Sequence, residues 1–241
     1  SPEHEGARVA LEALLRDPDL RGEAARILEP VYELRGDWEA LIRSAEILLA
    51  EEQDPEERVA LLSKIGNTCS QRIGDQRRAF DAYGRAFRED PGRDDVRETL
   101  IAHAAPINAW NDLVALFRGV AEGLGGDPLA RTLWLRIADI EFRWNNNIER
   151  AVSAYERVLD QNPGDPDALE LLEATYRKAE RWQDLLAVYR RRLDITSDPD
   201  AHDEILVGIA LVYEEMLADN EAAVRTYREM LERDPANRRA L

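Results

Sequence analysis

A single spacing of 72 residues runs through this chain of 241 residues. Three tryptophans, Trp38, Trp110 and Trp182, lie 72 residues apart. Alanine, tyrosine and proline follow the same period, at Ala79, Ala151 and Ala223, at Tyr83, Tyr155 and Tyr227, and at Pro91, Pro163 and Pro235. A unit copied three times at a fixed period is the signature of a stacked repeat protein. Such an architecture favours an extended binding surface over a catalytic pocket.

Each 72-residue unit is predicted to hold four helices. In the first unit the apolar periodicity places them at 19–35, 38–52, 55–73 and 76–89, and the later units follow the same plan. Apolar residues spaced i, i+3, i+4 and i+8 lie on one stripe of a helix. Because no segment alternates with period two, we expect no sheet.

The third and fourth helices of each unit repeat most clearly. A small residue in the third helix (Gly66, Ala138, Ala210) would let a neighbouring helix approach closely. The fourth helix begins at an Asp or Asn that can cap free N–H groups, namely Asp75, Asn147 and Asp219. It ends before an Asp-Pro or Asn-Pro pair, because proline disfavours helical geometry in the residue before it.

These features resemble the tetratricopeptide repeat family, whose unit is a pair of helices in 34 residues. The small residue, the Ala and Tyr of the next helix and the closing Pro carry the resemblance. It implies an all-α, right-handed α-α superhelical solenoid of helix-turn-helix repeats with no sheet. The interval from Ala210 to Ala223 exceeds the family norm by one residue, which predicts a longer turn. The pairs that contain Trp depart from the pattern, since they carry Leu where the family has Ala.

The resemblance covers nearly the whole chain and predicts one solenoid over residues 1–241. Its units are expected at about 19–90, 91–162 and 163–234, each with two helix pairs. Residues 1–18 read as the tail of a preceding repeat and 235–241 as the start of a following one. The chain is therefore expected to be a fragment of a longer array.

By resemblance, a partner protein or peptide would lie in a concave groove lined by the first helix of each pair. The predicted groove residues follow i, i+4, i+8 spacing in three copies: Ser63, Asn67 and Gln71; Leu135, Asp139 and Arg143; Val207, Leu211 and Glu215. Their chemistry differs between copies, as expected of positions that face solvent or a partner. The Lys/Asn/Arg clamp of the chaperone-binding subclass is not expected, because Ser63 stands where that clamp has Lys.

The charge balance narrows the range of partners. The formal net charge is −17, which argues against nucleic acid or an anionic membrane as the main partner. A basic peptide or protein is compatible with it, and so is a simple role in solubility. The sequence has no stretch of 18 uninterrupted apolar residues, so we expect no membrane-spanning helix.

We expect no enzyme activity, no cofactor and no metal site. The three histidines, His4, His103 and His202, lack partners at zinc-ligand spacing. The acid-rich stretches 165–167 and 198–200 lack the glycine and distal glutamate of a calcium loop and read as helix caps. Glycines 123, 125 and 126 follow a helix, not a strand, so they read as a turn. Cys69 and the repeated aromatic residues are expected in the core.

The resulting hypothesis is a non-catalytic protein-interaction scaffold. Two alternatives stay open: a self-assembling structural array, and the regulatory region of a larger enzyme. With only one cysteine the compartment is unassigned, and a cytoplasmic location is favoured. Lysine occurs only at Lys64 and Lys178, and this preference for arginine suggests a GC-rich, bacterial genome.

Overall fold

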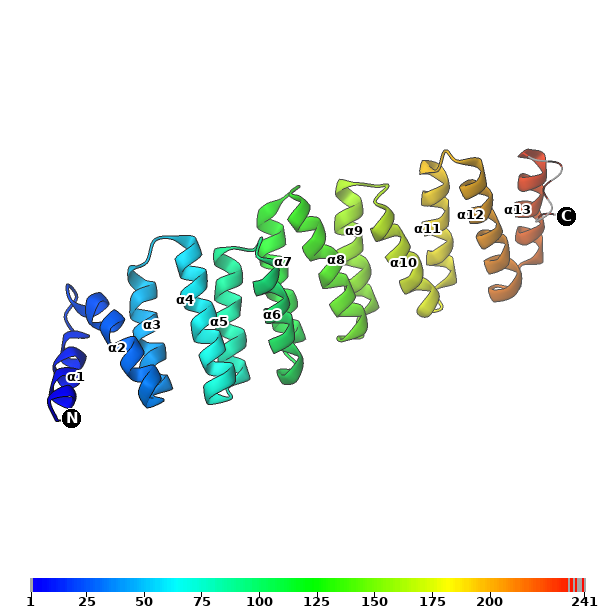
Figure 1. Cartoon of the computed structure of the whole chain (residues 1–241). Coiled ribbons are helices and arrows are strands. Elements are labelled where there is room, and N and C mark those ends of the chain that lie inside the picture. Colours follow the sequence, from blue (N-terminus) through cyan, green and yellow to red (C-terminus); the bar gives the residue numbers. More distant parts are fainter. Residues whose placement is uncertain (1, 234, 236, 238–239, 241) are drawn as a thin grey trace. The chain divides into compact units, whose positions relative to one another are not determined.

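A computed structural model describes residues 2–233, 235, 237 and 240, and the side chains among them from residue 5 onward. The side chain of His4 and most of the predicted start of a following repeat at 235–241 lie outside the described residues. The described residues form helices and connecting turns, without a strand (Figure 1). The prediction of an all-α helical-repeat fold is confirmed.

The helices follow one another with short connections. Their bounds are α1 (Pro2–Leu14), α2 (Arg21–Arg35), α3 (Trp38–Glu51), α4 (Pro55–Thr68), η1 (Cys69–Ile73), α5 (Gln76–Glu89), α6 (Asp94–Ala104), η2 (Ala105–Ile107), α7 (Trp110–Leu124), α8 (Pro128–Arg143), α9 (Ile148–Gln161), α10 (Pro166–Lys178), α11 (Trp182–Ile195), α12 (Pro199–Leu211), η3 (Val212–Met216) and α13 (Asn220–Arg233). The four helices predicted in the first 72-residue repeat match α2, α3, α4 together with η1, and α5, within two residues at each end.

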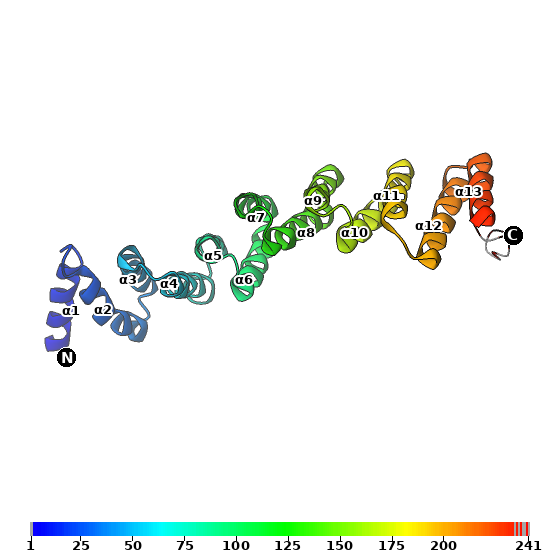
Figure 2. The same ribbon diagram turned by 90° about the horizontal axis from the view of Figure 1, so that it is seen from above.

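The chain divides into two compact units, Ser1–Val120 and Ala121–Leu241. Within each unit, neighbouring helices pack in chain order, most closely α4 with α5 in the first and α8 with α9 in the second. Figure 2 shows α8, α10 and α12 of the second unit in one layer and α9, α11 and α13 in the other. The division into three 72-residue repeats stays a prediction.

Asp and Asn side chains begin the helices as predicted. The Asp75 carboxylate accepts a hydrogen bond from the Arg78 N–H at 2.9 Å. Asn147 and Asp219 accept from the corresponding N–H groups at 3.0 Å each. In the acid-rich stretches, Asp165 caps α10 and Asp198 caps α12. These caps satisfy N–H groups that the first turn of a helix leaves without an internal partner.

The extra residue of the repeat lies inside the helix and not in a longer turn. Residues Cys69–Ile73 and Val212–Met216 form wide π-type turns that continue α4 and α12. In each case the next capping residue closes the turn, with the Asp75 N–H donating to the Cys69 carbonyl at 2.9 Å. Asp219 and Asn147 repeat that bond to Tyr213 and Glu141. The prediction that the extra residue lengthens the turn between the helices was therefore wrong, because the residue widens the last turn of the helix.

The core of each unit consists of fully buried leucines, isoleucines and phenylalanines. Examples are Leu62 and Phe87 in the first unit and Leu159 and Leu185 in the second. Gly66 fits the role predicted for it, since a Cβ atom there would lie 2.6 Å from the Tyr83 ring. Its missing side chain lets α5 pack closely on α4. Each buried large apolar side chain contributes about 1.5–3 kcal/mol to folding.

Candidate interaction surface

The predicted groove residues lie on the surface of α4, α8 and α12 and their extensions. Exposure is greatest along the later turns of each helix. Ser63, Leu135, Asp139 and Val207 are half-buried, whereas Asn67, Gln71, Arg143, Leu211 and Glu215 are exposed. The first copy belongs to the first compact unit and the other two belong to the second.

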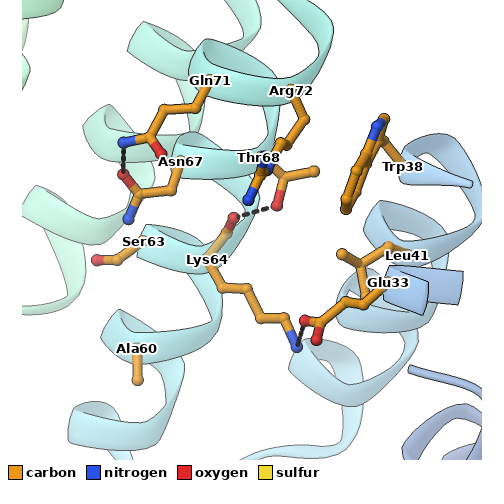
Figure 3. A pocket seen from close by; sticks show the side chains of 10 residues that line it. All are labelled: Glu33, Trp38, Leu41, Ala60, Ser63, Lys64, Asn67, Thr68, Gln71 and Arg72. Atoms are coloured by element: carbon orange, nitrogen blue, oxygen red, sulfur yellow. Dashed lines mark hydrogen bonds and ion pairs between the residues drawn. The ribbon is translucent and has the colours of Figure 1, made fainter. Parts of the chain in front are cut away.

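The first copy of the predicted groove residues lines a cleft. Ser63, Asn67 and Gln71 border a hollow of about 570 Å³, together with residues from α2 and the start of α3 (Figure 3). Its other lining residues are Glu33, Trp38, Leu41, Ala60, Lys64, Thr68 and Arg72. The volume lies within the range of about 300–1,000 Å³ that is usual for ligand sites.

An apolar side and a polar side face one another across this cleft. Trp38 is half-buried and Leu41 is buried on one side, while the amides of Asn67 and Gln71 stand on the other (Figure 3). The two amides are joined by a long hydrogen bond of 3.5 Å. Because that bond is weak, both amides keep donors and acceptors for a bound chain.

The charges that border the cleft are partly compensated. The Lys64 ammonium lies 3.1 Å from a Glu29 carboxylate oxygen and 3.3 Å from one of Glu33. The Arg72 guanidinium instead lies over the Trp38 ring, 5.1 Å from its centroid. Lys64 is thus occupied by acids of α2, whereas Arg72 contacts an aromatic face.

The 72-residue period predicts the three repeated tryptophans in the core, and the prediction is confirmed for Trp110. Trp110 is buried, but Trp38 and Trp182 are half-buried. Trp38 therefore adds an aromatic wall to the cleft that the sequence did not predict. No sequence signal distinguishes Trp38 from the buried Trp110, because each is the first residue of its helix.

The second unit holds a hollow of about 540 Å³ that was missed. It lies along α10 and the end of α11, and it is lined by Glu170, Ala174 and Arg177 among others. Glu173 also lines the hollow; its side chain is 13% exposed and pairs with Arg177 at 2.5 Å. The i, i+4 spacing of Glu170 and Ala174 is the same signal that selected Ser63 and Asn67.

The third copy of the predicted stripe is largely apolar. Leu211 is 41% exposed and Met216 is 47% exposed. Half-buried Val207 precedes Leu211 on α12, and Glu215 is the acidic member of the stripe, whereas Met216 follows the stripe in η3. The three copies therefore offer different chemistry to a partner.

The titratable groups singled out in the sequence do not assemble a reactive centre. The Cys69 thiol is buried, and burial raises its pKa, which disfavours the nucleophilic thiolate. The His103 ring stacks on Tyr83 with centroids 5.2 Å apart, and burial lowers its pKa. Within the described part of the chain, no three His, Cys, Asp or Glu side chains are grouped as metal ligands. No described helix is long and apolar enough to cross a membrane.

Two segments match models of one protein family. Residues 133–165 and residues 168–201 each match a model described as tetratricopeptide repeat. These segments cover most of α8 to α11. No curated protein matches the chain.

Many solved structures resemble the chain. The Naa15/Naa10 complex bound to HypK-THB has a TM-score of 0.52 and 16% identity, covering 97% of this chain and 35% of that chain. The C-terminal part of a TPR repeat-containing protein from Cytophaga hutchinsonii has a TM-score of 0.45 and 13% identity, covering 99% and 93%. MamA protein has a TM-score of 0.43 and 18% identity, covering 75% and 93%. At these identities the likeness shows the fold alone. Of the three structures, the Naa15/Naa10 complex is the one whose TM-score, 0.52, is high enough to support it.

Proposed function

This chain is a tetratricopeptide repeat protein, and from that premise we propose that it binds an extended segment of another protein in the cleft of α4 and η1. Its helix pairs act as a scaffold for protein–protein interaction. The scaffold itself is non-catalytic. The partner segment lies along Ser63, Asn67 and Gln71, against the aromatic wall of Trp38.

The cleft of the first unit is the observation that carries this proposal. It combines about 570 Å³ of space with two amides that keep free donors and acceptors and a half-buried aromatic side chain. An extended peptide needs partners for its backbone N–H and C=O groups, and Asn67 and Gln71 offer both kinds. Aromatic side chains supply contact area at low cost in conformational entropy.

Selection from a displayed peptide library tests the proposal. Random peptides of about ten residues, which span about 33 Å when extended, are displayed with their C-termini fused to the carrier. Peptides selected on the unmodified chain are then measured against Asn67→Arg, which places a long side chain into the cleft. We expect binding to fall at least tenfold, because the cleft is filled.

Two further variants locate the site. Gln183→Arg, at an exposed position on α11, is the matched control and should bind as the unmodified chain does. Leu211→Glu tests the apolar stripe of the second unit. Full binding by Asn67→Arg would refute the assignment to the α4 cleft, and loss in Leu211→Glu alone would move the site to α12. A library that yields no binder would contradict peptide binding itself.

Self-assembly is the second candidate, favoured by apolar side chains exposed on α1 and α2. Leu34 is 90% exposed, Val9 is 53% exposed and Ile27 is 48% exposed. Leu34 also borders a hollow of about 560 Å³ between the two helices. Light scattering over a range of concentrations tests this candidate. A mass that stays monomeric at high concentration contradicts it, while growth that Leu34→Glu abolishes supports it.

A further inference from the structure

We propose that Arg72, held against the Trp38 ring, is the anchor for one acidic side chain, Asp or Glu, within the segment bound in the α4 cleft. This inference rests on the proposed function and specifies the chemistry of the partner at one position. It assigns an internal side-chain carboxylate, as opposed to the carboxylate of a chain terminus.

Arg72 occupies an exposed position beside the Trp38 ring. It belongs to the wide turn η1, it is exposed, and it lines the cleft. Its guanidinium lies 5.1 Å from the centroid of the Trp38 ring. The attraction between the cation and the ring favours this position of the guanidinium, which carries five N–H donors. A restrained, planar guanidinium matches a carboxylate, which it can bind with two parallel hydrogen bonds.

In the described part of the chain, the charged groups near Arg72 do not form an ion pair with it. Among the described residues, no carboxylate lies within salt-bridge distance of Arg72. Among the residues that line the cleft, Glu33 is the acidic one, and it faces Lys64 at 3.3 Å. By contrast, Arg78 beyond the turn pairs with Glu39 at 2.6 Å. In a chain with 49 acidic and 32 basic residues, internal partners are abundant, so a cleft arginine without one is suited to an outside carboxylate.

Comparison of the three repeats shows which residues the wide turn needs. The capping residue that closes the wide turn recurs as Asp75, Asn147 and Asp219. The residue at the position of Arg72 changes to Trp144 and then to Met216. The turn therefore does not require an arginine, and its presence in the first copy is a property of that copy.

The net charge of −17 repels a strongly acidic segment at long range. At physiological ionic strength this repulsion is screened beyond about 8 Å. A single carboxylate in an otherwise neutral or basic segment would satisfy Arg72 without that penalty. We therefore expect one acidic position in the partner and no acidic run.

The same display library gives the test, because fusion of the peptide C-termini removes terminal carboxylates. Peptides selected on the unmodified chain should share one Asp or Glu. As synthetic peptides with amidated C-termini, they should bind Arg72→Gln roughly tenfold more weakly, as expected when one charge-assisted contact is lost. Arg72→Lys should recover part of the affinity. A fresh selection on Arg72→Glu should enrich Lys or Arg at the aligned position.

The control variant is Arg43→Gln, an exposed arginine of α3 that does not line the cleft. It should bind the selected peptides as the unmodified chain does. Thermal unfolding of each variant separates loss of contact from loss of folding. Selected peptides without a shared acid, or an acid preference that survives in Arg72→Gln, would overturn the carboxylate assignment and leave the cleft intact. Binding that requires a free C-terminal carboxylate would overturn it as well. Binding that ignores Asn67→Arg would instead refute the cleft.

Discussion

Besides Gly125, six described turn residues have a backbone that L-residues rarely adopt. They recur with the 72-residue period: Gly36, Asn108 and Glu180 after one helix of the unit, and Gly74, Asn146 and Ala218 after another, with φ between 49° and 82°. Glycine adopts this left-handed conformation without steric cost, and Asn tolerates it better than most residues. Ala218 has neither advantage, so it stores strain that its glycine counterpart Gly74 does not.

Replacing Ala218 with glycine should therefore stabilise the protein. The left-handed conformation costs an L-residue about 1–2 kcal/mol, while the extra freedom of glycine in the unfolded chain costs about 0.4–1 kcal/mol. We expect Ala218→Gly to raise the free energy of unfolding by about 0.5 kcal/mol, measured by urea denaturation. Ala187→Gly, at an exposed position inside α11, should lower it by about 1 kcal/mol. Equal destabilisation by both changes would show that Ala218 is unstrained.

At the scale of helices, Asp165 both caps α10 and ties it to α8. Its carboxylate accepts the Ala168 N–H at 3.0 Å and two hydrogen bonds from the Arg131 guanidinium, at 2.6 and 2.8 Å. The side chain is 3% exposed. The hydrogen bonds from Arg131 hold the pKa of Asp165 below its ordinary value, although burial opposes them. The contact therefore stabilises the ionised form of the folded protein.

The depressed pKa fixes the direction of a pH effect. In the unfolded chain the pKa of an Asp side chain is about 3.9. Above that pH both states are ionised and the stabilisation is complete, and it is lost as pH falls through the lower folded pKa. Asp165→Asn should therefore be less stable than the unmodified chain at pH 7, and the difference should shrink below about pH 4. Denaturation curves across this range measure it.

Asp160→Asn, on an exposed part of α9, is the control for this pH series. It should stay close to the unmodified chain at every pH. A difference for Asp165→Asn that is the same at pH 7 and pH 3 would contradict the ionic role of Asp165 and leave only its role as a hydrogen-bond acceptor in the cap.

The helices themselves could be predicted well from the sequence, because their signals are local. Proline, capping acids and apolar spacing define the ends of α2 to α5 within two residues, with η1 counted as the end of α4. The extra residue was assigned to a turn and lies in η1 and η3, since both placements keep Asp75 and Asp219 as caps. Spacing alone does not distinguish a wide helical turn from a longer loop, whose energies differ through hydrogen bonds such as that from Asp75 to Cys69.

The candidate site could be predicted in part. Ser63, Asn67 and Gln71 were predicted because helical spacing places them beside the core stripe, and their role in binding stays a prediction. Trp38 and Arg72 were missed because each depends on a contact between different helices, α3 and η1. A tryptophan that recurs with the repeat is predicted as core by its periodicity, and only its half-buried state shows that it borders a cleft.

For the whole molecule, the important property is how far a local disturbance spreads. Each compact unit has its own buried residues, such as Phe87 in the first and Leu185 in the second. Phe87 packs on Phe117 with ring centroids 5.1 Å apart. In stacked repeats each element contacts its neighbours only, so stability is approximately a sum of local terms. A core lesion should consequently stay near its origin.

Paired truncations test that locality. Phe87→Ala should cost about 3–5 kcal/mol and Leu185→Ala about 2–5 kcal/mol, because each deletes a fully buried side chain and leaves a cavity. Hydrogen exchange followed residue by residue should show Phe87→Ala loosening α4 to α7 and Leu185→Ala loosening α10 to α12. The two patterns should overlap little, since the residues lie in different compact units. Uniform loss of protection along the chain in either variant would mean that the units unfold as one cooperative body, and peptide binding at α4 would then also weaken in Leu185→Ala. Binding at α4 that survives Leu185→Ala but fails in Phe87→Ala is the outcome expected of a modular scaffold.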